Sequence, residues 1–252
     1  MKQLCSIVLG LLLASTTLRG ELLIAAASDL RFALDELITK YAEQQPAARI
    51  KPVYGSSGNF YAQIMNDAPF DLFFSADASY PRQLITKGKG KDADLFVYAI
   101  GRIVIWVPKN SPIKVEELGI KALLEGSVKK VAIANPEHAP YGRAAVAAMK
   151  KLGVYDRVSR RLVLGENIAQ TAQFVESGNA DIGIIAYSLA IAPKMKDAGR
   201  FWEIPLDAFP RLEQAGLVIA GTKNGDAARE FRTFMQGKTG QEILNHYGFI
   251  LP

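Results

Sequence analysis

Small polar residues stand at four places where a predicted strand gives way to a predicted helix. Ser28 follows the apolar run 22–27, and Ser57 follows the run 50–54 within a turn flanked by glycines. Two later turns, 136–142 and 165–168, precede helices in the same way. A helix N-terminus offers unpaired N–H groups and the positive end of the helix dipole, so each turn suits an anion. Serine is also an ordinary helix cap, so no single turn is specific alone.

The elements that must position these turns alternate along the chain. Apolar or β-branched runs predict strands, and apolar residues at a spacing of three and four predict helices. Strands are expected at 22–27, 50–54, 71–75, 102–107, 130–134, 162–164, 181–186 and 217–220, and helices at 29–42, 58–65, 142–151, 167–176, 227–236 and 241–247. This alternation predicts an α/β protein with mixed, mostly parallel sheets and helices on both faces. Ligands of such sheets bind at the carboxyl ends of strands, where the four turns lie.

Chain length and pattern predict two doubly wound lobes rather than one. The 252 residues contain two blocks of alternating elements, each with its own apolar residues. We expect residues 21–101 and 208–252 to form lobe 1 and residues 102–207 to form lobe 2, joined by a two-strand hinge. Each lobe then contributes two of the four turns, so all four can meet in one cleft.

The first 20 residues have the pattern of a secretory signal peptide. Lys2 precedes the apolar run 7–14, which is too short to span a bilayer. Cys5, the one cysteine, lies in this segment, so a mature chain would carry no disulfide. We therefore expect a protein that is exported to the periplasm or another extracytoplasmic compartment.

The charge pattern argues against a nucleic-acid partner. The net charge is +5, but lysine and arginine are scattered among acidic residues. The densest basic run, 87–91, alternates lysine with glycine and has no aromatic residues between, which is typical of a solvated turn. A small molecule is the expected partner.

Several motifs, taken together and in order, resemble the periplasmic molybdate-binding proteins of ABC transporters. The resemblance runs from about residue 22 to residue 252 and rests on AAASDL at 25–30, GSSG at 55–58, DLFFSAD at 71–77, NPEHAPYG at 135–142, DIGIIAYS at 181–188 and YGF at 247–249. It implies the type II periplasmic-binding-protein fold and no enzymatic activity. It also implies a monomer that has no cofactor, binds a molybdate or tungstate oxyanion and delivers it to an ABC-transporter membrane permease.

The resemblance further implies which residues bind the oxyanion through hydroxyl or backbone N–H groups. By position these are Ser28, Ser57, Tyr141 and Ile168. Some members add a tyrosine hydroxyl from a late strand; here that place holds Ala186, with Tyr187 next to it, and we expect the Tyr141 hydroxyl to take over the contact. Because all these groups donate, an oxyanion that must itself donate, such as protonated phosphate, is disfavoured.

Two other functions stay open from the sequence. One is a receptor for sulfate or another small oxyanion, because the sequence does not determine the size of the cavity. The other is a secreted serine hydrolase that uses Ser57 with His138. The turn lacks the G-x-S-x-G spacing of a nucleophile elbow, however, since Asn59 stands where the last glycine would be. Two histidines and one early cysteine also provide no zinc site.

Overall fold

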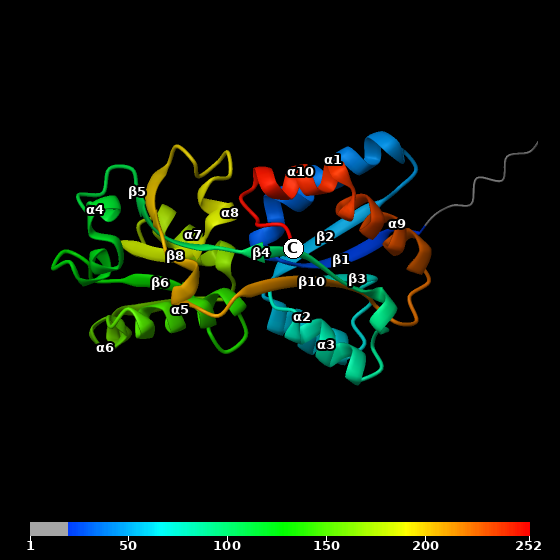
Figure 1. The fold of residues 1–252 in the computed structure, drawn as a ribbon, viewed down its shortest axis with the longest axis horizontal. Helices are drawn as coiled ribbons and strands as arrows, with labels where there is room; N and C mark the ends of the chain where they lie inside the picture. Colours follow the sequence, from blue (N-terminus) through cyan, green and yellow to red (C-terminus); the bar gives the residue numbers. More distant parts are fainter. Residues whose placement is uncertain (1–19) are drawn as a thin grey trace, which may run out of the picture.

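The computed structural model describes residues 20–252, so the predicted signal segment, apart from Gly20, lies outside the described residues. Within this part the chain forms two five-stranded sheets that lie side by side, each with its own helices (Figure 1). The strand orders are β2-β1-β3-β10-β4 and β7-β6-β8-β5-β9. We call the first sheet with its helices lobe 1 and the second lobe 2.

The sheet of lobe 1 is covered by helices on both faces. Its strands are β1 (Leu22–Ala27), β2 (Ile50–Gly55), β3 (Leu72–Ser75), β4 (Leu95–Gly101) and β10 (Leu212–Val218). One face carries α1 (Arg31–Gln44), α9 (Gly225–Gln236) and α10 (Lys238–His246), and the other carries α2 (Ser57–Met65) and α3 (Ser79–Thr86). The adjacent residues Phe73 and Phe74 are fully buried in different apolar clusters, as expected for a strand covered on both sides.

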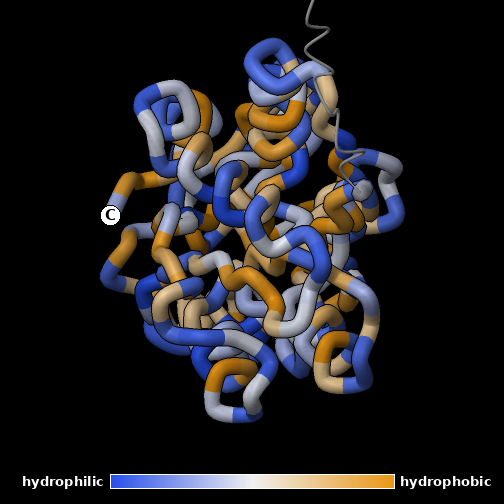
Figure 2. The backbone as a smooth tube through the Cα atoms, turned by 90° about the vertical axis from the view of Figure 1, so that its right-hand side faces the viewer, coloured by the Kyte–Doolittle hydropathy of each residue, from blue (hydrophilic) through white to orange (hydrophobic). Residues whose placement is uncertain are grey.

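Lobe 2 repeats this arrangement with shorter helices. Its strands are β5 (Ile103–Pro108), β6 (Val131–Ala134), β7 (Leu162–Gly165), β8 (Ile182–Ala186) and β9 (Gly199–Glu203). Its helices are α4 (Val115–Leu118), α5 (Pro140–Lys151), α6 (Tyr155–Val158), α7 (Ile168–Glu176) and α8 (Tyr187–Ala190). Trp106, Ile133 and Ile184 belong to the apolar core of this lobe. In Figure 2, which looks along the long axis with lobe 1 nearest the viewer, most of the peripheral turns are hydrophilic.

Strand direction follows from where the chain crosses between lobes. It passes to lobe 2 between Gly101 and Ile103 and returns between Glu203 and Leu212. The predicted lobe limits, 101/102 and 207/208, fall in these two connections. β1 is parallel to β2 and β3, and β6 is parallel to β7 and β8, whereas β10 and β5 are antiparallel to their neighbours. Because β5 and β10 enter their sheets from the other lobe, they run away from the cleft toward which β1 and β6 point.

Some elements differ from the sequence-based prediction. The helix expected from residue 29 is preceded by a 3-10 turn, Ser28–Leu30. The late strand expected at 217–220 runs instead from Leu212 to Val218. The sequence does not predict its first half, because Gln214, which is buried, interrupts the apolar pattern that marks a strand. α3, β4 and β9 are not among the predicted elements. The sheets also contain more antiparallel pairing than expected, because β5 and β10 are each reversed. No helix in residues 20–252 is long and apolar enough to cross a membrane.

Candidate functional site

A small cavity lies between the lobes, at the carboxyl ends of β1 and β2. The space free of protein atoms there is about 190 Å³, which suits a small ligand, since pockets for drug-sized ligands measure about 300–1,000 Å³. Lobe 1 contributes Ala27, Ser28, Asp29, Gly55, Ser56, Ser57 and Ala76, and lobe 2 contributes Ala139, Pro140, Tyr141 and Ile168. The structure therefore brings together four of the predicted ligand residues: Ser28, Ser57, Tyr141 and Ile168. No lysine or arginine is among the lining residues.

Ser57 is presented by the N-terminus of α2. Ser56, the residue before the helix, has an extended backbone, and its Oγ accepts a hydrogen bond from the N–H of Asn59 at 3.4 Å. Ser57 is fully buried, and its Oγ accepts from the N–H of Ala76 at 3.0 Å. A hydroxyl can accept and donate at once, so the O–H of Ser57 keeps its proton for a ligand. Its N–H belongs to the first helical turn, where the helix offers no acceptor.

Ser28 connects the end of β1 to the N-terminus of α7 in the other lobe. Its Oγ donates to Asn167 Oδ1 at 3.0 Å and accepts from the N–H of Ala169 at 3.3 Å. Asn167 Oδ1 also accepts from the N–H groups of Ala169 and Gln170, each at 3.0 Å, so it caps α7. The N–H of Ile168 lies in the same first turn and faces the same end of the helix.

Tyr141 is the second residue of α5, directly after Pro140 at the first helical position. Its hydroxyl donates to Asp29 Oδ2 at 2.9 Å. The single phenolic proton is therefore used within the protein, and the Tyr141 N–H is the group left for a ligand. Because of burial, the pKa of Tyr141 lies well above its ordinary value, so the phenol is neutral.

Asp29 is a buried carboxyl group that the prediction of ligand residues does not include. Its Oδ2 accepts from Tyr141 and, at 2.7 Å, from Gln214 Nε2, which also donates to the Tyr141 hydroxyl at 3.0 Å. Burial raises the pKa of Asp29 to about 6, against the lowering effect of these two hydrogen bonds. The sequence shows that Asp29 directly follows Ser28. It does not show the hydrogen-bond partners of Asp29, because Tyr141 and Gln214 are 112 and 185 residues away along the chain.

Ala186 and Tyr187 do not line the cavity. Ala186 is the buried last residue of β8. The Tyr187 ring lies 3.8 Å from the Arg102 guanidinium carbon and packs edge-on against Phe201. It lines a separate hollow beside the C-terminal residues 248–251. The chain turns into α8 directly after β8, so Tyr187 packs beside the crossing between the lobes.

The lobes touch each other along the edge of the cavity. The N–H of Gly58 donates to the carbonyl of His138 at 2.9 Å, and Arg143 forms an ion pair with Asp77 at 2.6 Å. Ser56 Oγ and His138 Nδ1 are 2.9 Å apart. His138 thus faces the serine next to the one that the hydrolase hypothesis requires.

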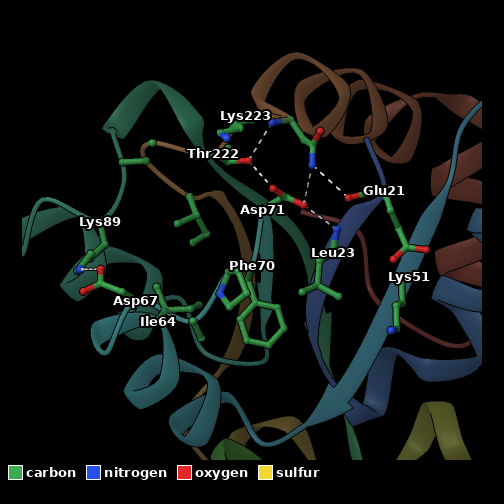
Figure 3. Close-up of a pocket in the computed structure, with 16 residues that line it drawn as sticks. Glu21, Leu23, Lys51, Ile64, Asp67, Phe70, Asp71, Lys89, Thr222 and Lys223 are labelled. Carbon is green, nitrogen blue, oxygen red and sulfur yellow. Dashed lines mark hydrogen bonds and ion pairs between the residues drawn. The ribbon is translucent and has the colours of Figure 1, made fainter. Parts of the chain in front are cut away.

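A larger hollow of about 550 Å³ lies at the opposite end of β1 and β3 (Figure 3). Asp71 is among the residues that line it, but its carboxylate accepts hydrogen bonds from the Leu23 N–H at 2.6 Å, from Asn224 Nδ2 at 3.2 Å and from the Thr222 hydroxyl. These bonds tie the start of β1 to the turn after β10, which is a structural role. Within the described residues, no group of three or more His, Cys, Asp or Glu side chains could hold a metal ion.

Comparisons with known proteins identify the family of this chain. The family model of the bacterial extracellular solute-binding proteins matches residues 22–250. The molybdate-binding protein of Rhodobacter capsulatus is 34% identical over 245 residues, covering 97% of this chain and 93% of that protein. The molybdate-binding protein of Azotobacter vinelandii is 32% identical over 238 residues, covering 94% and 93%.

Solved structures support the same fold. The periplasmic molybdate-binding protein of A. vinelandii superposes with a TM-score of 0.86 at 30% identity, covering 92% of this chain and 99% of that one. The sulfate-binding protein of Mycobacterium tuberculosis has a TM-score of 0.78 at 16% identity, covering 92% and 86%, which shows the fold alone. The predicted α/β fold class is confirmed. The chain belongs to the family of bacterial extracellular solute-binding proteins, and its function is binding rather than catalysis.

Proposed function

We propose that this protein is the extracytoplasmic solute-binding component of an ABC importer for molybdate. The observation that carries this conclusion is the meeting of four neutral donor turns, two from each lobe, at one small buried cavity. Relatives that are 34% and 32% identical over more than nine-tenths of the chain are molybdate-binding proteins. A putative ABC transporter substrate-binding lipoprotein of Bacillus subtilis, 29% identical and covering 90% of this chain and 85% of that protein, supports the transporter assignment.

The oxyanion is bound through neutral donors in this proposal. Ser57 donates hydroxyl and N–H hydrogen bonds, and Ser28, Tyr141 and Ile168 donate N–H bonds, because the hydroxyl protons of Ser28 and Tyr141 are used within the protein. Three helix N-termini, of α2, α5 and α7, add favourable dipoles. Such groups satisfy a buried dianion without a lysine or arginine, because each oxygen can receive a charge-assisted hydrogen bond.

The proposal also covers export, the second ligand and the delivery of the oxyanion to the transporter. The chain is exported by its N-terminal segment and acts as a monomer in the periplasm or another extracytoplasmic space. Tungstate, a tetrahedral dianion like molybdate, is a second ligand of the same cavity. Binding shifts the lobes toward the closed arrangement, because the ligand bonds to both lobes only there. The closed form then docks on the membrane permease.

Calorimetric titration with molybdate, tungstate, sulfate and phosphate tests the assignment. We expect saturable binding of one molybdate or tungstate per chain, with sulfate and phosphate much weaker. Trp106 and Trp202, both in lobe 2, provide an independent fluorescence signal. Tight sulfate binding would keep the mechanism and change the ligand, and a failure of all four anions to bind would overturn the proposed function.

A further inference from the structure

Asp29 lines the proposed oxyanion cavity and carries a buried carboxyl group. The residue is 1% exposed. Oδ2 accepts the hydrogen bonds from Tyr141 and Gln214. Oδ1 is buried and has no partner of hydrogen-bond geometry among residues 20–252, although the backbone N–H groups of Asp29 and Leu30 lie near the carboxyl group and lower its pKa. A buried carboxylate oxygen without a donor is costly, and such atoms call for a functional explanation.

The groups that face Asp29 are neutral. Besides Tyr141 on α5 and Gln214 on β10, they are Tyr98 on β4, whose hydroxyl donates to Gln214 Oε1 at 2.8 Å, and Ser188 on α8, whose hydroxyl donates to the Asp29 carbonyl at 2.8 Å. Burial keeps the pKa values of both phenols well above their ordinary range. None of these groups carries a positive charge, and the hydrogen bonds from Gln214 and Tyr141 lower the pKa of Asp29 less than burial raises it.

The basic side chains at the lobe contact are engaged elsewhere. Arg143 bonds to Asp77 at 2.6 Å and to the Tyr80 hydroxyl at 3.0 Å. The His138 ring lies between Ser56 and Glu166, with 3.7 Å between His138 Nε2 and a Glu166 carboxylate oxygen. A dianion entering the cavity would therefore meet an ionised carboxylate with no cation between them. Two like charges in one buried site raise the pKa of the protonatable partner.

Resting on the proposed function, we propose that Asp29 takes up one proton from solvent when the oxyanion binds and then donates a hydrogen bond from Oδ1 to an oxyanion oxygen. The existing contacts suit this state. Oδ2 continues to accept from Tyr141 and Gln214, while the proton occupies Oδ1, which accepts no hydrogen bond of good geometry. Protonated Asp29 therefore no longer repels the oxyanion and donates a hydrogen bond to it, as the other groups of the cavity do.

This coupling determines how affinity depends on pH. In the free protein the pKa of Asp29 is about 6, so above that pH the group is ionised and binding requires a proton. The association constant then falls about tenfold per pH unit as pH rises, for as long as the bound form keeps the proton. Below about pH 6 both states are protonated and the dependence on Asp29 disappears.

Calorimetry with molybdate at about pH 8 measures the number of protons taken up on binding. When the titration is repeated in buffers of different ionisation enthalpy, the observed binding enthalpy changes in proportion to that number. We expect about one proton per molybdate for the wild-type protein. In Asp29→Asn the amide reproduces the neutral donor but cannot titrate. That variant should bind without proton uptake, with nearly constant affinity from about pH 7 to about pH 9, and more tightly than wild type at the upper end. His138→Gln is the control and should retain the proton uptake.

The outcomes separate this inference from the proposed function. Wild-type protein that does not bind molybdate contradicts the proposed function. Molybdate binding without proton uptake, or equal uptake in Asp29→Asn, overturns the role of Asp29 and leaves the function intact. Tight phosphate binding that Asp29→Asn abolishes would also overturn it, since Asp29 would then accept a proton from the ligand. The wild-type measurement does not depend on the variant, whose fold is checked by circular dichroism.

Discussion

Ser57 and Asp29 line the same cavity, yet their chemistry differs. Ser57 is a permanent donor whose Oγ already accepts a hydrogen bond from the N–H of Ala76. Asp29 is a donor only when protonated, and its surroundings raise its pKa toward that state. Both depend on neighbours from distant parts of the chain, so a substitution at either residue tests a specific contact.

Ser57→Ala should weaken molybdate binding by roughly 10- to 100-fold, because a hydrogen bond to a charged group contributes about 1.5–3 kcal/mol. Calorimetric titration of the purified variant measures the change. Ser79→Ala is the matched control, since Ser79 also opens a helix of lobe 1 but is exposed and outside the cavity. Equal affinities of the two variants would remove Ser57 from the site.

Asp29→Asn should also alter the pH dependence of stability without any ligand. The folded-state pKa of about 6 lies above the ordinary value of 3.8, so ionisation of Asp29 destabilises the fold as pH rises between these values. The variant should gain free energy of unfolding relative to wild type over that interval, by up to about 3 kcal/mol, and show a constant difference above it. Urea unfolding of both proteins at about pH 4 and about pH 7.5 measures this, and a difference independent of pH would contradict it.

At the scale of elements, the site consists of helix N-termini that two different sheets aim at one point. α2 starts directly after β2, and α7 starts shortly after β7, so each first turn lies at a carboxyl strand end. Parallel pairing of β1 with β2, and of β6 with β7, brings those ends to the cleft. The caps of these helices thus stabilise the elements and orient the site at the same time.

Asn167→Asp separates these two roles. Aspartate caps a helix as well as asparagine does, so the melting temperature without ligand should change little. A negative charge beside the cavity should lower molybdate affinity by roughly 10- to 100-fold, equivalent to about 1–3 kcal/mol of repulsion. Calorimetry and thermal unfolding measure the two effects. Asn167→Ser, a neutral cap, is the control, and an aspartate variant that binds as well as the serine variant would contradict the prediction.

At the scale of the whole molecule, the lobes approach closely beside the cavity at Gly58, whose N–H donates to the His138 carbonyl. A Cβ there would lie 2.6 Å from the His138 carbonyl oxygen and 2.8 Å from the Tyr80 hydroxyl. The first of these is backbone of the other lobe, which cannot move aside unless the lobes separate. Glycine at this helical position is otherwise unfavourable by about 1 kcal/mol relative to alanine, so its presence suits the lobe contact.

Gly58→Ala should therefore reduce molybdate affinity by more than about tenfold while leaving the ligand-free fold as stable as wild type or slightly more stable. X-ray scattering of the molybdate-saturated variant should give a larger radius of gyration than wild type. Gly126→Ala is the control, because a Cβ at that position has no heavy atom within 4 Å. Unchanged affinity and size in Gly58→Ala would show that this contact does not limit closure.

Local patterns determined much of this protein. The apolar periods predict most strands and helices, and the alternation of the two predicts an α/β fold, because both depend on neighbouring residues. The ordered motifs predict the family, and Ser28, Ser57, Tyr141 and Ile168 meet at one cavity as the resemblance implied. β4, by contrast, is absent from the prediction although its residues are strongly apolar.

Only the tertiary structure decided the direction of side chains at the contact between the lobes. Tyr187 packs toward Arg102 instead of the cavity, and the Tyr141 hydroxyl bonds to Asp29 instead of a ligand. The burial of Asp29 requires Gln214, which is 185 residues away. The physical reason is that desolvation and hydrogen-bond pairing arise where distant segments pack, and no local spacing in a sequence encodes which segments those are.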